Sequence, residues 1–199
     1  MADMLILIPA AGASSRMRGR DKLLEEVRGV PLLRDRVKMT LGLGHPVLVT
    51  LPPDRPWRAE ALRGLNDPSL SKIVIEDAAT GLSASLRAGA DRALRDGRTA
   101  LMVLLPDLPD LTMNDMRVVL QAYDKKRIIR ATSEDGIAGH PVIFPSNLLI
   151  EMRHLTGDRG AQDLLRRHPV TVIALPGAHA TTDLDTPEAW AAWRARQTG

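Results

Sequence analysis

Short apolar runs of strand length alternate along this chain with segments whose apolar residues recur at helical spacing. Parallel strands need a crossover connection between each pair, and a helix is the usual crossover. The alternation therefore predicts an α/β protein, a three-layer α/β/α sandwich around a mostly parallel sheet. The predicted strands are 5–8, 47–51, 72–75, 101–105, 127–131, 141–144 and 170–175. Helical stripes cover 33–41, 82–94 and 116–123, a short helix is expected at Leu164-Leu165, and a last helix opens at Thr186-Pro187.

The chain has 199 residues, which is enough for one domain with a sizeable core, and no linker or repeat divides it. We therefore expect a single domain over residues 1–199. Segment 4–13 is apolar like a secretion signal, but Asp3 precedes it and a basic loop follows directly. No apolar run reaches the ~20 residues of a membrane helix, so we expect a soluble, cytoplasmic protein that does not bind membranes.

Composition narrows the classes of function. The sequence contains no cysteine, which excludes disulfide scaffolds, thiolate metal sites and thiol nucleophiles. Its net charge is +3, but only 3% of its residues are aromatic, too few for the stacking platforms of single-strand nucleic-acid binders. Arginine side chains can bind the phosphate groups of small molecules as well as those of nucleic acids. We expect a phosphorylated small ligand and no nucleic acid.

The most informative segment is 9–22, which begins where the first predicted strand ends. Ala10, Ala11 and Gly12 have almost no side chain, so their backbone N–H groups can approach a phosphate closely. Four cations follow within seven residues. The segment is neither a P-loop nor a dinucleotide fingerprint, because it lacks Gly-Lys-Ser/Thr and G-x-G-x-x-G. It predicts a polyanion site; the alternative is a basic loop that is merely solvated. The cations are Arg16, Arg18, Arg20 and Lys22.

Asp107 directly follows the predicted strand 101–105, at the edge of the sheet where segment 9–22 is also expected. A carboxylate there can bind a hard cation such as Mg²⁺, which bridges to substrate phosphates. The alternative is an ordinary turn aspartate near proline.

Segment 9–22 resembles the signature loop of the molybdenum cofactor cytidylyl- and guanylyltransferases and similar nucleotidyltransferases, which reads roughly A-[AG]-G-x-S-x-R-M-G-x-x-K. The resemblance implies a Rossmann-like nucleotide-diphospho-sugar transferase fold. It also implies that the loop backbone and Arg16 hold a nucleoside triphosphate while Lys22 contacts the α-phosphate. Arg18 departs from the pattern, since the family usually has glycine there. The matching residues are Ala10, Ala11, Gly12, Ser14, Arg16, Met17 and Lys22.

The same resemblance suggests which base is bound. Pro9-Ala10-Ala11-Gly12 is typical of the cytidylyl branch, whereas the guanylyl branch tends to Leu-Ala-Gly-Gly. Segment 81–86 resembles the part of the cytidylyl branch that closes over the base, with Ser83 and Ser85 as candidate nucleotide-binding residues. The alternative for these two serines is helix capping. The resemblance therefore favours CTP over GTP.

Two acidic segments match the family's metal site. Asp107-Leu108-Pro109 matches Asp-x-Pro, and segment 183–188 resembles the D-x-D-T-P-x-D run before the last helix. The resemblance implies a Mg²⁺ site on Asp107 and one of Asp183 and Asp185. We favour Asp185, whose alternative role is to cap the last helix.

Two further segments match the family's acceptor site. Gly139-His140-Pro141-Val142 matches G-H-P-[VI], and segment 157–161 matches G-D-[RK]-G-A. A phosphate acceptor is already an anion at neutral pH, so we expect His140 to orient the acceptor rather than to act as a base. The alternative for both segments is an ordinary turn. The implied acceptor-binding residues are His140, Gly157, Asp158 and Arg159.

The resemblance thus implies transfer of CMP from CTP to a phosphorylated pterin, the molybdenum cofactor, with release of pyrophosphate. A molybdoenzyme or its chaperone is a possible partner. Three alternatives stay open: guanylyl transfer to the same cofactor, cytidylyl transfer to methylerythritol phosphate, and a cofactor-binding escort without catalysis.

Overall fold

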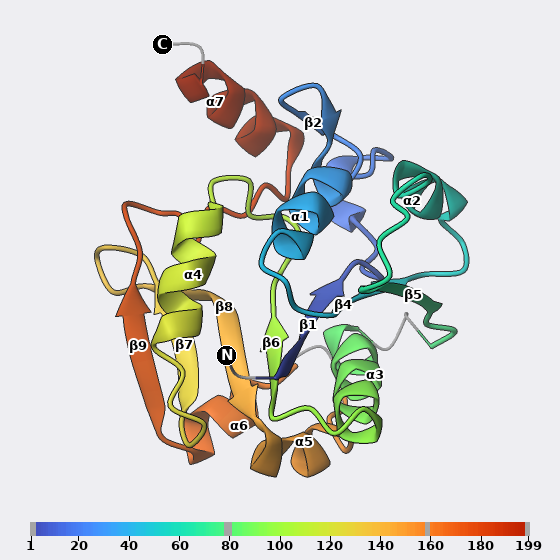
Figure 1. Ribbon diagram of the computed structural model, residues 1–199. Coiled ribbons are helices and arrows are strands. Elements are labelled where there is room, and N and C mark those ends of the chain that lie inside the picture. The colour runs from blue at the N-terminus through green and yellow to red at the C-terminus, as the bar shows by residue number, and fades with distance from the viewer. Residues whose placement is uncertain (1–2, 78–80, 158–159, 198–199) are drawn as a thin grey trace.

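The computed structural model describes residues 3–77, 81–157 and 160–197 of the chain. Within them, a seven-stranded sheet lies between two layers of helices, in the order β5-β4-β1-β6-β8-β7-β9 (Figure 1). This confirms the predicted α/β sandwich. The strands are β1 (Met4–Pro9), β4 (Val47–Leu51), β5 (Leu70–Val74), β6 (Ala100–Val103), β7 (Ile128–Thr132), β8 (Ala138–Pro145) and β9 (Val170–Ala174).

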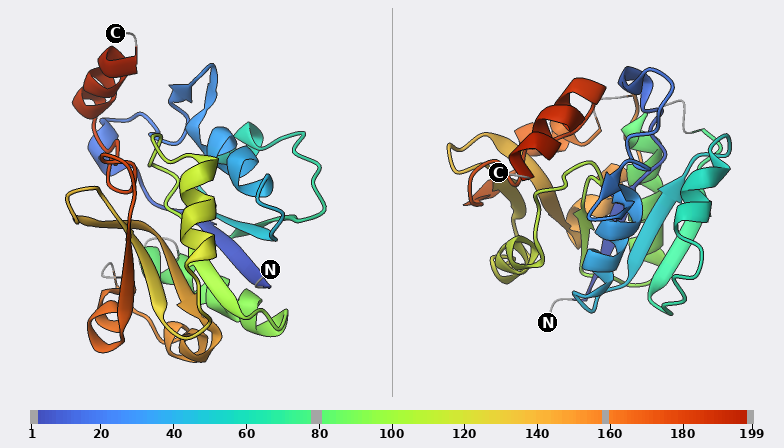
Figure 2. Two further views of the ribbon diagram at one scale, coloured as in Figure 1. Left: turned by 60° about the vertical axis from the view of Figure 1, so that its left-hand side comes forward. Right: turned by 90° about the horizontal axis from the view of Figure 1, so that it is seen from above.

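Most of the helices fall into two groups, one on each face of the sheet (Figures 1 and 2). Alternate residues of β1 show why: Ile6 packs into one core cluster and Leu7 into the other, because successive side chains of a strand point to opposite faces. On the Ile6 face lie α1 (Leu32–Leu41) and α4 (Met113–Gln121); on the Leu7 face lie α3 (Leu82–Arg95), α5 (Ser146–Met152) and α6 (Gln162–Arg167). Helix α7 (Pro187–Gln197) lies beyond the carboxyl ends of the strands, and its buried tryptophans join the core cluster of Ile6 (Figure 1).

Local signals set the ends of several elements. Helix α1 follows Pro31, as expected, and stops before Gly42 and Gly44. The N-terminus of α4 has a capping box, in which Thr112 and Asp115 each accept a hydrogen bond from the other's backbone N–H. In α3, a side chain at Gly89 would come within 2.7 Å of Leu7, so glycine allows this helix to pack closely on β1.

Strand β8 runs antiparallel to both β6 and β7, whereas the remaining strand pairs of the sheet are parallel. The reason is local: only a short turn separates β7 from β8, and a turn of that length can join antiparallel strands only. The reversal brings the first residues of β8 to the edge where the parallel strands end. His140 therefore lies at that edge.

Three elements were not foreseen from the sequence. These are the short helix α2 (Pro56–Ala61), the helix α5, and a two-stranded hairpin made of β2 (Glu26–Val27) and β3 (Val30–Pro31). All are short, so their apolar periodicity is too weak to stand out. The remaining boundaries differ from expectation by a few residues; β6, for example, ends at Val103 rather than at residue 105.

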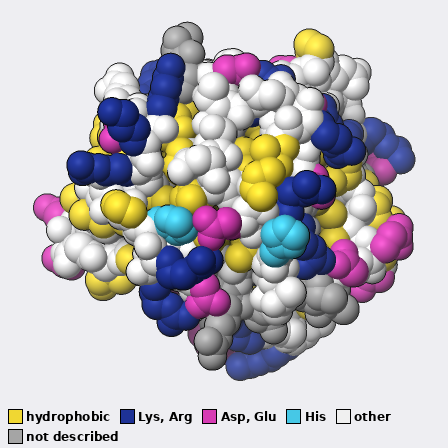
Figure 3. Space-filling view, turned by 90° about the horizontal axis from the view of Figure 1, so that it is seen from below, with side chains coloured by type: hydrophobic (Ala, Val, Ile, Leu, Met, Phe, Trp, Pro, Cys, Tyr) yellow, Lys and Arg dark blue, Asp and Glu magenta, His cyan; other side chains and the backbone are white. Residues whose placement is uncertain are grey.

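Two observations bear on larger partners. None of the described helices is long and apolar enough to cross a lipid bilayer. On the face seen from below, opposite the ends of the parallel strands, Lys and Arg side chains are interspersed with Asp and Glu, and the described residues drawn there form no broad basic field (Figure 3).

Candidate active site

The topology of the sheet fixes where a ligand can bind. From β1 the chain goes first to β4 and β5 on one side, and later returns to β6 on the other side of β1. The loops that leave the carboxyl ends of β1 and β6 therefore diverge and leave a crevice between them. Segment 10–22 follows β1 and Asp107 follows β6, so both reach this crevice as predicted.

Segment 10–22, which we call the phosphate loop, has an irregular path with one turn of 3₁₀ helix at Ser15–Met17. Ser14 and Arg18 both adopt left-handed backbone conformations, with φ of 50° and 51°. Such a conformation costs a residue other than glycine ~1 kcal/mol, which gives a physical reason for glycine in the family's motif where this chain has Arg18. The Arg18 side chain is exposed and pairs with Glu188 at 2.8 Å.

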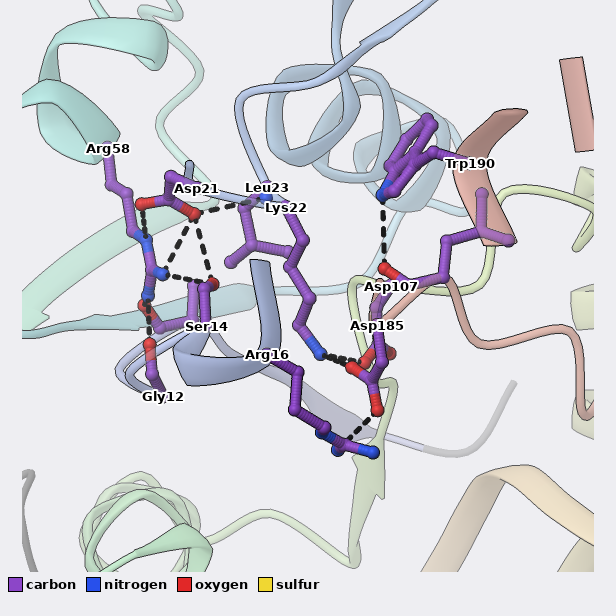
Figure 4. A network of polar contacts seen from close by, with 12 residues as sticks. Gly12, Ser14, Arg16, Asp21, Lys22, Leu23, Arg58, Asp107, Asp185 and Trp190 are labelled. Atoms are coloured by element: carbon purple, nitrogen blue, oxygen red, sulfur yellow. Dashed lines mark hydrogen bonds and ion pairs between the residues drawn. The ribbon is translucent and has the colours of Figure 1, made fainter. Parts of the chain in front are cut away.

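Lys22 ends the phosphate loop and joins it to the acidic residues (Figure 4). Its Nζ donates hydrogen bonds to Asp107 Oδ2, at 2.5 Å, and to Asp185. Burial disfavours the ammonium, but the two carboxylates outweigh this effect and raise the pKa of Lys22 above its ordinary value. Lys22 therefore stays charged at neutral pH. Arg16, which is 70% exposed, pairs with the other carboxylate oxygen of Asp185.

The position of Asp185 is set by its neighbours in the chain. The backbone N–H of Leu184 donates to Asp107 O at 3.3 Å, and the indole of Trp190 donates to Leu184 O at 3.0 Å. Thr186 Oγ1 accepts from the N–H of Ala189 at the start of α7, while the carboxylate of Asp185 contacts Lys22 and Arg16 instead. The buried Trp190 thus anchors α7 and directs Asp185 into the crevice.

Asp107 and Asp185 are suited to hold a divalent cation whose remaining ligands come from a substrate and from water. Asp107 Oδ1 is buried and has no hydrogen-bond partner among the described residues, so one carboxylate oxygen is left for a ligand. Burial, together with these two carboxylates, raises the pKa of nearby Asp183. The described residues contain no cluster of three or more potential metal ligands. Two carboxylates completed by phosphate oxygens and water is the usual arrangement for Mg²⁺.

A cavity of about 320 Å³ lies between the phosphate loop and Asp107. Gly12 faces open space here, since a side chain at this residue would meet no atom within 4 Å. Ser85 lines the cavity and accepts a hydrogen bond from Thr50 at 2.9 Å. The lining residues are Pro9, Gly12, Lys22, Leu23, Gly81, Leu82, Ser85, Leu105, Pro106 and Asp107.

Ser83 and Ser85 do not cap α3, because the residue before that helix is Gly81 and no side chain caps its first turn. Ser83 is fully buried and donates to the carbonyl of Gly157. The hydroxyl of Ser83 therefore ties the loop at Gly157 to the start of α3, beside the cavity.

Among the candidate acceptor residues, His140 lies at the start of β8, which neighbours β6 on the side away from β1. Burial lowers the pKa of His140 to about 4, so its ring is neutral at physiological pH, and Nδ1 lies 3.4 Å from Val103 O. Gly139 packs so tightly that a side chain would come within 2.1 Å of Ala180 O. Asp158 and Arg159 lie outside the described residues.

Two residues that hold the phosphate loop in place, Asp21 and Arg58, were not foreseen from the sequence. Asp21 is the one carboxylate in an otherwise basic segment. That isolation is the sequence signal that could have indicated a structural role for Asp21. Arg58 lies in the unforeseen α2, and nothing local distinguishes it from a surface arginine.

Known proteins similar to this chain include nucleotidyltransferases, in agreement with the phosphate loop and carboxylates described above. The model of the family described as "MobA-like NTP transferase domain" matches residues 6–172. Among curated proteins, the chain is 26% identical to the purine catabolism protein PucB of Bacillus subtilis, with 90% of each protein covered. It is 27% identical to a protein of Opitutus terrae named "Probable molybdenum cofactor guanylyltransferase", with 83% of this chain and 82% of that protein covered.

Solved structures show the same fold. Rv0371c of Mycobacterium tuberculosis has a TM-score of 0.80 at 24% identity and covers 97% of this chain and 98% of its own; its manganese complex has a TM-score of 0.77 at 23% identity, with 96% and 97% covered. The 4-diphosphocytidyl-2C-methyl-D-erythritol synthase of Anaerococcus prevotii has a TM-score of 0.77 at 14% identity, with 100% and 97% covered. The family match over residues 6–172, on this fold, shows that the chain belongs to the MobA-like NTP transferases, a family of nucleotidyltransferases, as its motifs predict.

Proposed function

We propose that this protein transfers CMP from CTP to a phosphorylated, pterin-type acceptor and releases pyrophosphate, and that residues 1–199 act as one catalytic domain. One observation carries the proposal: the ammonium of Lys22 lies between the carboxylates of Asp107 and Asp185, beside a cavity lined by the phosphate loop. Cations and carboxylates converge there on a space that suits a nucleotide.

The reaction is a substitution at phosphorus. An oxygen of the acceptor's phosphate attacks the α-phosphorus of CTP and forms a new P–O bond. The bond from the α-phosphorus to the oxygen that bridges it to the β-phosphate breaks, and pyrophosphate leaves with that electron pair. No proton has to be removed from an ionised acceptor, which agrees with the low basicity of His140. His140 then orients the acceptor, together with Gly157, Asp158 and Arg159.

Lys22 acts as a fixed positive charge. Because its pKa is raised, it stays protonated and stabilises negative charge that develops around the α-phosphate, without exchanging a proton. Arg16 is exposed and long enough to hold the outer phosphates, which the N–H groups of Ala11, Gly12, Ala13 and Ser14 would also contact. Ala10 contributes its small size rather than its N–H group, which donates to Thr50 O at 2.9 Å. Pro9 ends β1 and sets the start of this cradle.

Asp107 and Asp185 are the residues that would hold Mg²⁺. Bound there, the metal would supply positive charge to oxygens of the triphosphate. The unpartnered Oδ1 of Asp107 supports this assignment, as does the manganese complex of the structurally similar Rv0371c.

Cytosine is the base favoured by the resemblance of Pro9-Ala10-Ala11-Gly12 and of segment 81–86 to the cytidylyl branch; Ser85 of the latter segment lines the cavity. The relative named as a guanylyltransferase supports GTP as the second candidate. Methylerythritol phosphate as acceptor is the third candidate and is supported by the fold of the Anaerococcus prevotii enzyme alone. An escort without catalysis, a molybdoenzyme or chaperone partner and a cytoplasmic location remain predictions.

A nucleotide-by-acceptor assay tests the proposal. CTP or GTP with Mg²⁺ is combined with molybdenum-bound pterin or methylerythritol phosphate, and pyrophosphate release is measured. We expect release with CTP and the pterin. If pyrophosphate is released with GTP and not with CTP, the nucleotide of the proposal is GTP. If it is released with methylerythritol phosphate and not with the pterin, the acceptor is methylerythritol phosphate. Tight binding of the pterin without any release of pyrophosphate would contradict the proposed reaction and favour a cofactor-binding escort without catalysis.

A further inference from the structure

Arg58 is a fully buried arginine on α2, behind the phosphate loop (Figure 4). All five N–H groups of its guanidinium donate to residues of that loop. Nε and Nη2 bind the two carboxylate oxygens of Asp21, at 2.7 and 2.9 Å. Nη1 donates to Ala10 O and Gly12 O at 2.6 and 2.7 Å, and Nη2 also donates to Ser14 Oγ at 2.9 Å.

These contacts leave Arg58 no donor for a substrate, because a guanidinium has five N–H groups and each is already used. Arg16 differs, since most of its side chain is exposed to solvent beside the crevice. Arg58 therefore acts on the reaction only through the loop it holds.

Asp21 is the partner of Arg58 in a buried ion pair. Burial disfavours its ionised form, but the guanidinium of Arg58 outweighs burial and lowers the pKa of Asp21 below its ordinary value. The Trp57 indole donates to Asp21 Oδ2 at 3.1 Å, and the Leu23 N–H donates to Oδ1 at 3.1 Å. The pair is thus charged, bidentate and hydrogen-bonded, the arrangement that a buried ion pair needs.

The pair also fixes which way the peptide groups of the loop point. In a trans peptide the C=O and N–H groups point in opposite directions. Because the carbonyls of Ala10 and Gly12 point at Arg58, the N–H groups of Ala11 and Ala13 point away from it, toward the open side of the loop. Those N–H groups then face a phosphate without having to reorient.

We propose that Arg58 and Asp21 are positioning residues that preorganise the backbone N–H groups of the phosphate loop for a triphosphate. The inference rests on the proposed function. A lysine in place of Arg58 keeps the charge but offers fewer donors in a different geometry, so it cannot satisfy the same acceptors. A loop misplaced by ~1 Å can lower kcat/KM by about 10²-fold.

The test uses Arg58→Lys, Arg58→Met and Asp21→Asn in the full chain, with Leu149→Ala as a control. Leu149 is fully buried on α5, away from the site, so its variant is destabilised without touching the loop. Hydrogen exchange of loop amides 11–20 is measured without nucleotide, and the Kd for Mg·CTP and Mg·GTP is measured by calorimetry. We expect faster loop exchange and about tenfold or more weaker binding, with Arg58→Met more affected than Arg58→Lys. Leu149→Ala should exchange and bind like wild type.

A purely structural role for Arg58 predicts the opposite pattern. The variants would then lose thermal stability to the same extent as Leu149→Ala, yet keep wild-type loop exchange and nucleotide affinity, and the inference would be wrong. If Arg58 variants do not fold, Asp21→Asn decides by the same measurements. If wild-type protein binds neither triphosphate, the proposed function fails, while loop exchange still tests the role of Arg58.

Discussion

The phosphate loop and the start of β8 face the same crevice, but they are held in place in different ways. The loop is fixed by Arg58 from behind and by Lys22, which reaches Asp107 and Asp185 across the crevice. On the other side, β8 pairs with both β6 and β7, the N–H of His140 donates to Ala180 O at 3.0 Å, and Nδ1 of the ring lies 3.4 Å from Val103 O. The loop is therefore held by charged side chains, whereas the start of β8 is held by backbone hydrogen bonds and close packing. Because the two sides are held by different residues, we expect that each can be altered without the other.

Lys22→Ala should have the largest effect, and it tests the nucleotide side of the crevice. It removes the cation that bridges the two sides of the crevice, and we expect turnover to fall by about 10²–10³ if Lys22 counts as one oxyanion donor. Pyrophosphate release measures the effect. Lys72→Ala, an exposed lysine on β5, is the control and should behave like wild type. Unchanged turnover in Lys22→Ala would remove this residue from the mechanism.

Asp107→Asn should have the next largest effect. It replaces the carboxylate whose Oδ1 has no partner among the described residues and weakens the attraction for a divalent cation. Fewer charged ligands mean weaker binding, so we expect the Mg²⁺ concentration for half-maximal rate to rise by about tenfold or more. A titration of rate against Mg²⁺ measures it. An unshifted titration curve would contradict a metal site at Asp107.

Much of the nucleotide side could be predicted from the sequence because it is local. The strand, the small residues and the cations of the phosphate loop are consecutive, and Asp107 lies only four residues beyond the end of β6. Arg58 could not be predicted, since its role depends on the packing of α2 against a loop that is distant in the sequence. The antiparallel direction of β8 was likewise not specified, yet it is what brings His140 to the crevice.

Gly139→Ala tests the acceptor side. The new methyl group would meet Ala180 O, so the start of β8 must shift, at a cost of about 1–3 kcal/mol in unfolding free energy. We expect the KM for the acceptor to rise several-fold while the Kd for CTP stays near the wild-type value. Steady-state kinetics and calorimetry separate the two. A matching loss of CTP affinity would mean that the two sides are not independent.

The smallest expected effect is on stability at acid pH. His140 has a pKa near 4 in the folded protein against an ordinary value of 6.5, so between these values the unfolded chain binds a proton that the folded chain does not. The stabilisation by neutral His140 is therefore complete above pH 6.5 and is lost as the pH falls toward 4. Denaturant unfolding of wild type and His140→Gln across this range should show a shallower slope for the variant. Parallel curves would contradict a ring that stays neutral in the folded protein over this pH range.

The central claim is that the phosphate loop and the carboxylates opposite it form one triphosphate site. Heat protection measures it directly: the unfolding temperature of wild type and Lys22→Ala is recorded with each of the four ribonucleoside triphosphates, with and without Mg²⁺. At a ligand concentration of ~100 Kd, binding stabilises the folded state by about 2.7 kcal/mol, so we expect CTP with Mg²⁺ to raise the unfolding temperature of wild type by several degrees and that of the variant much less. Protection by no triphosphate, or equal protection of both proteins, would contradict the claim.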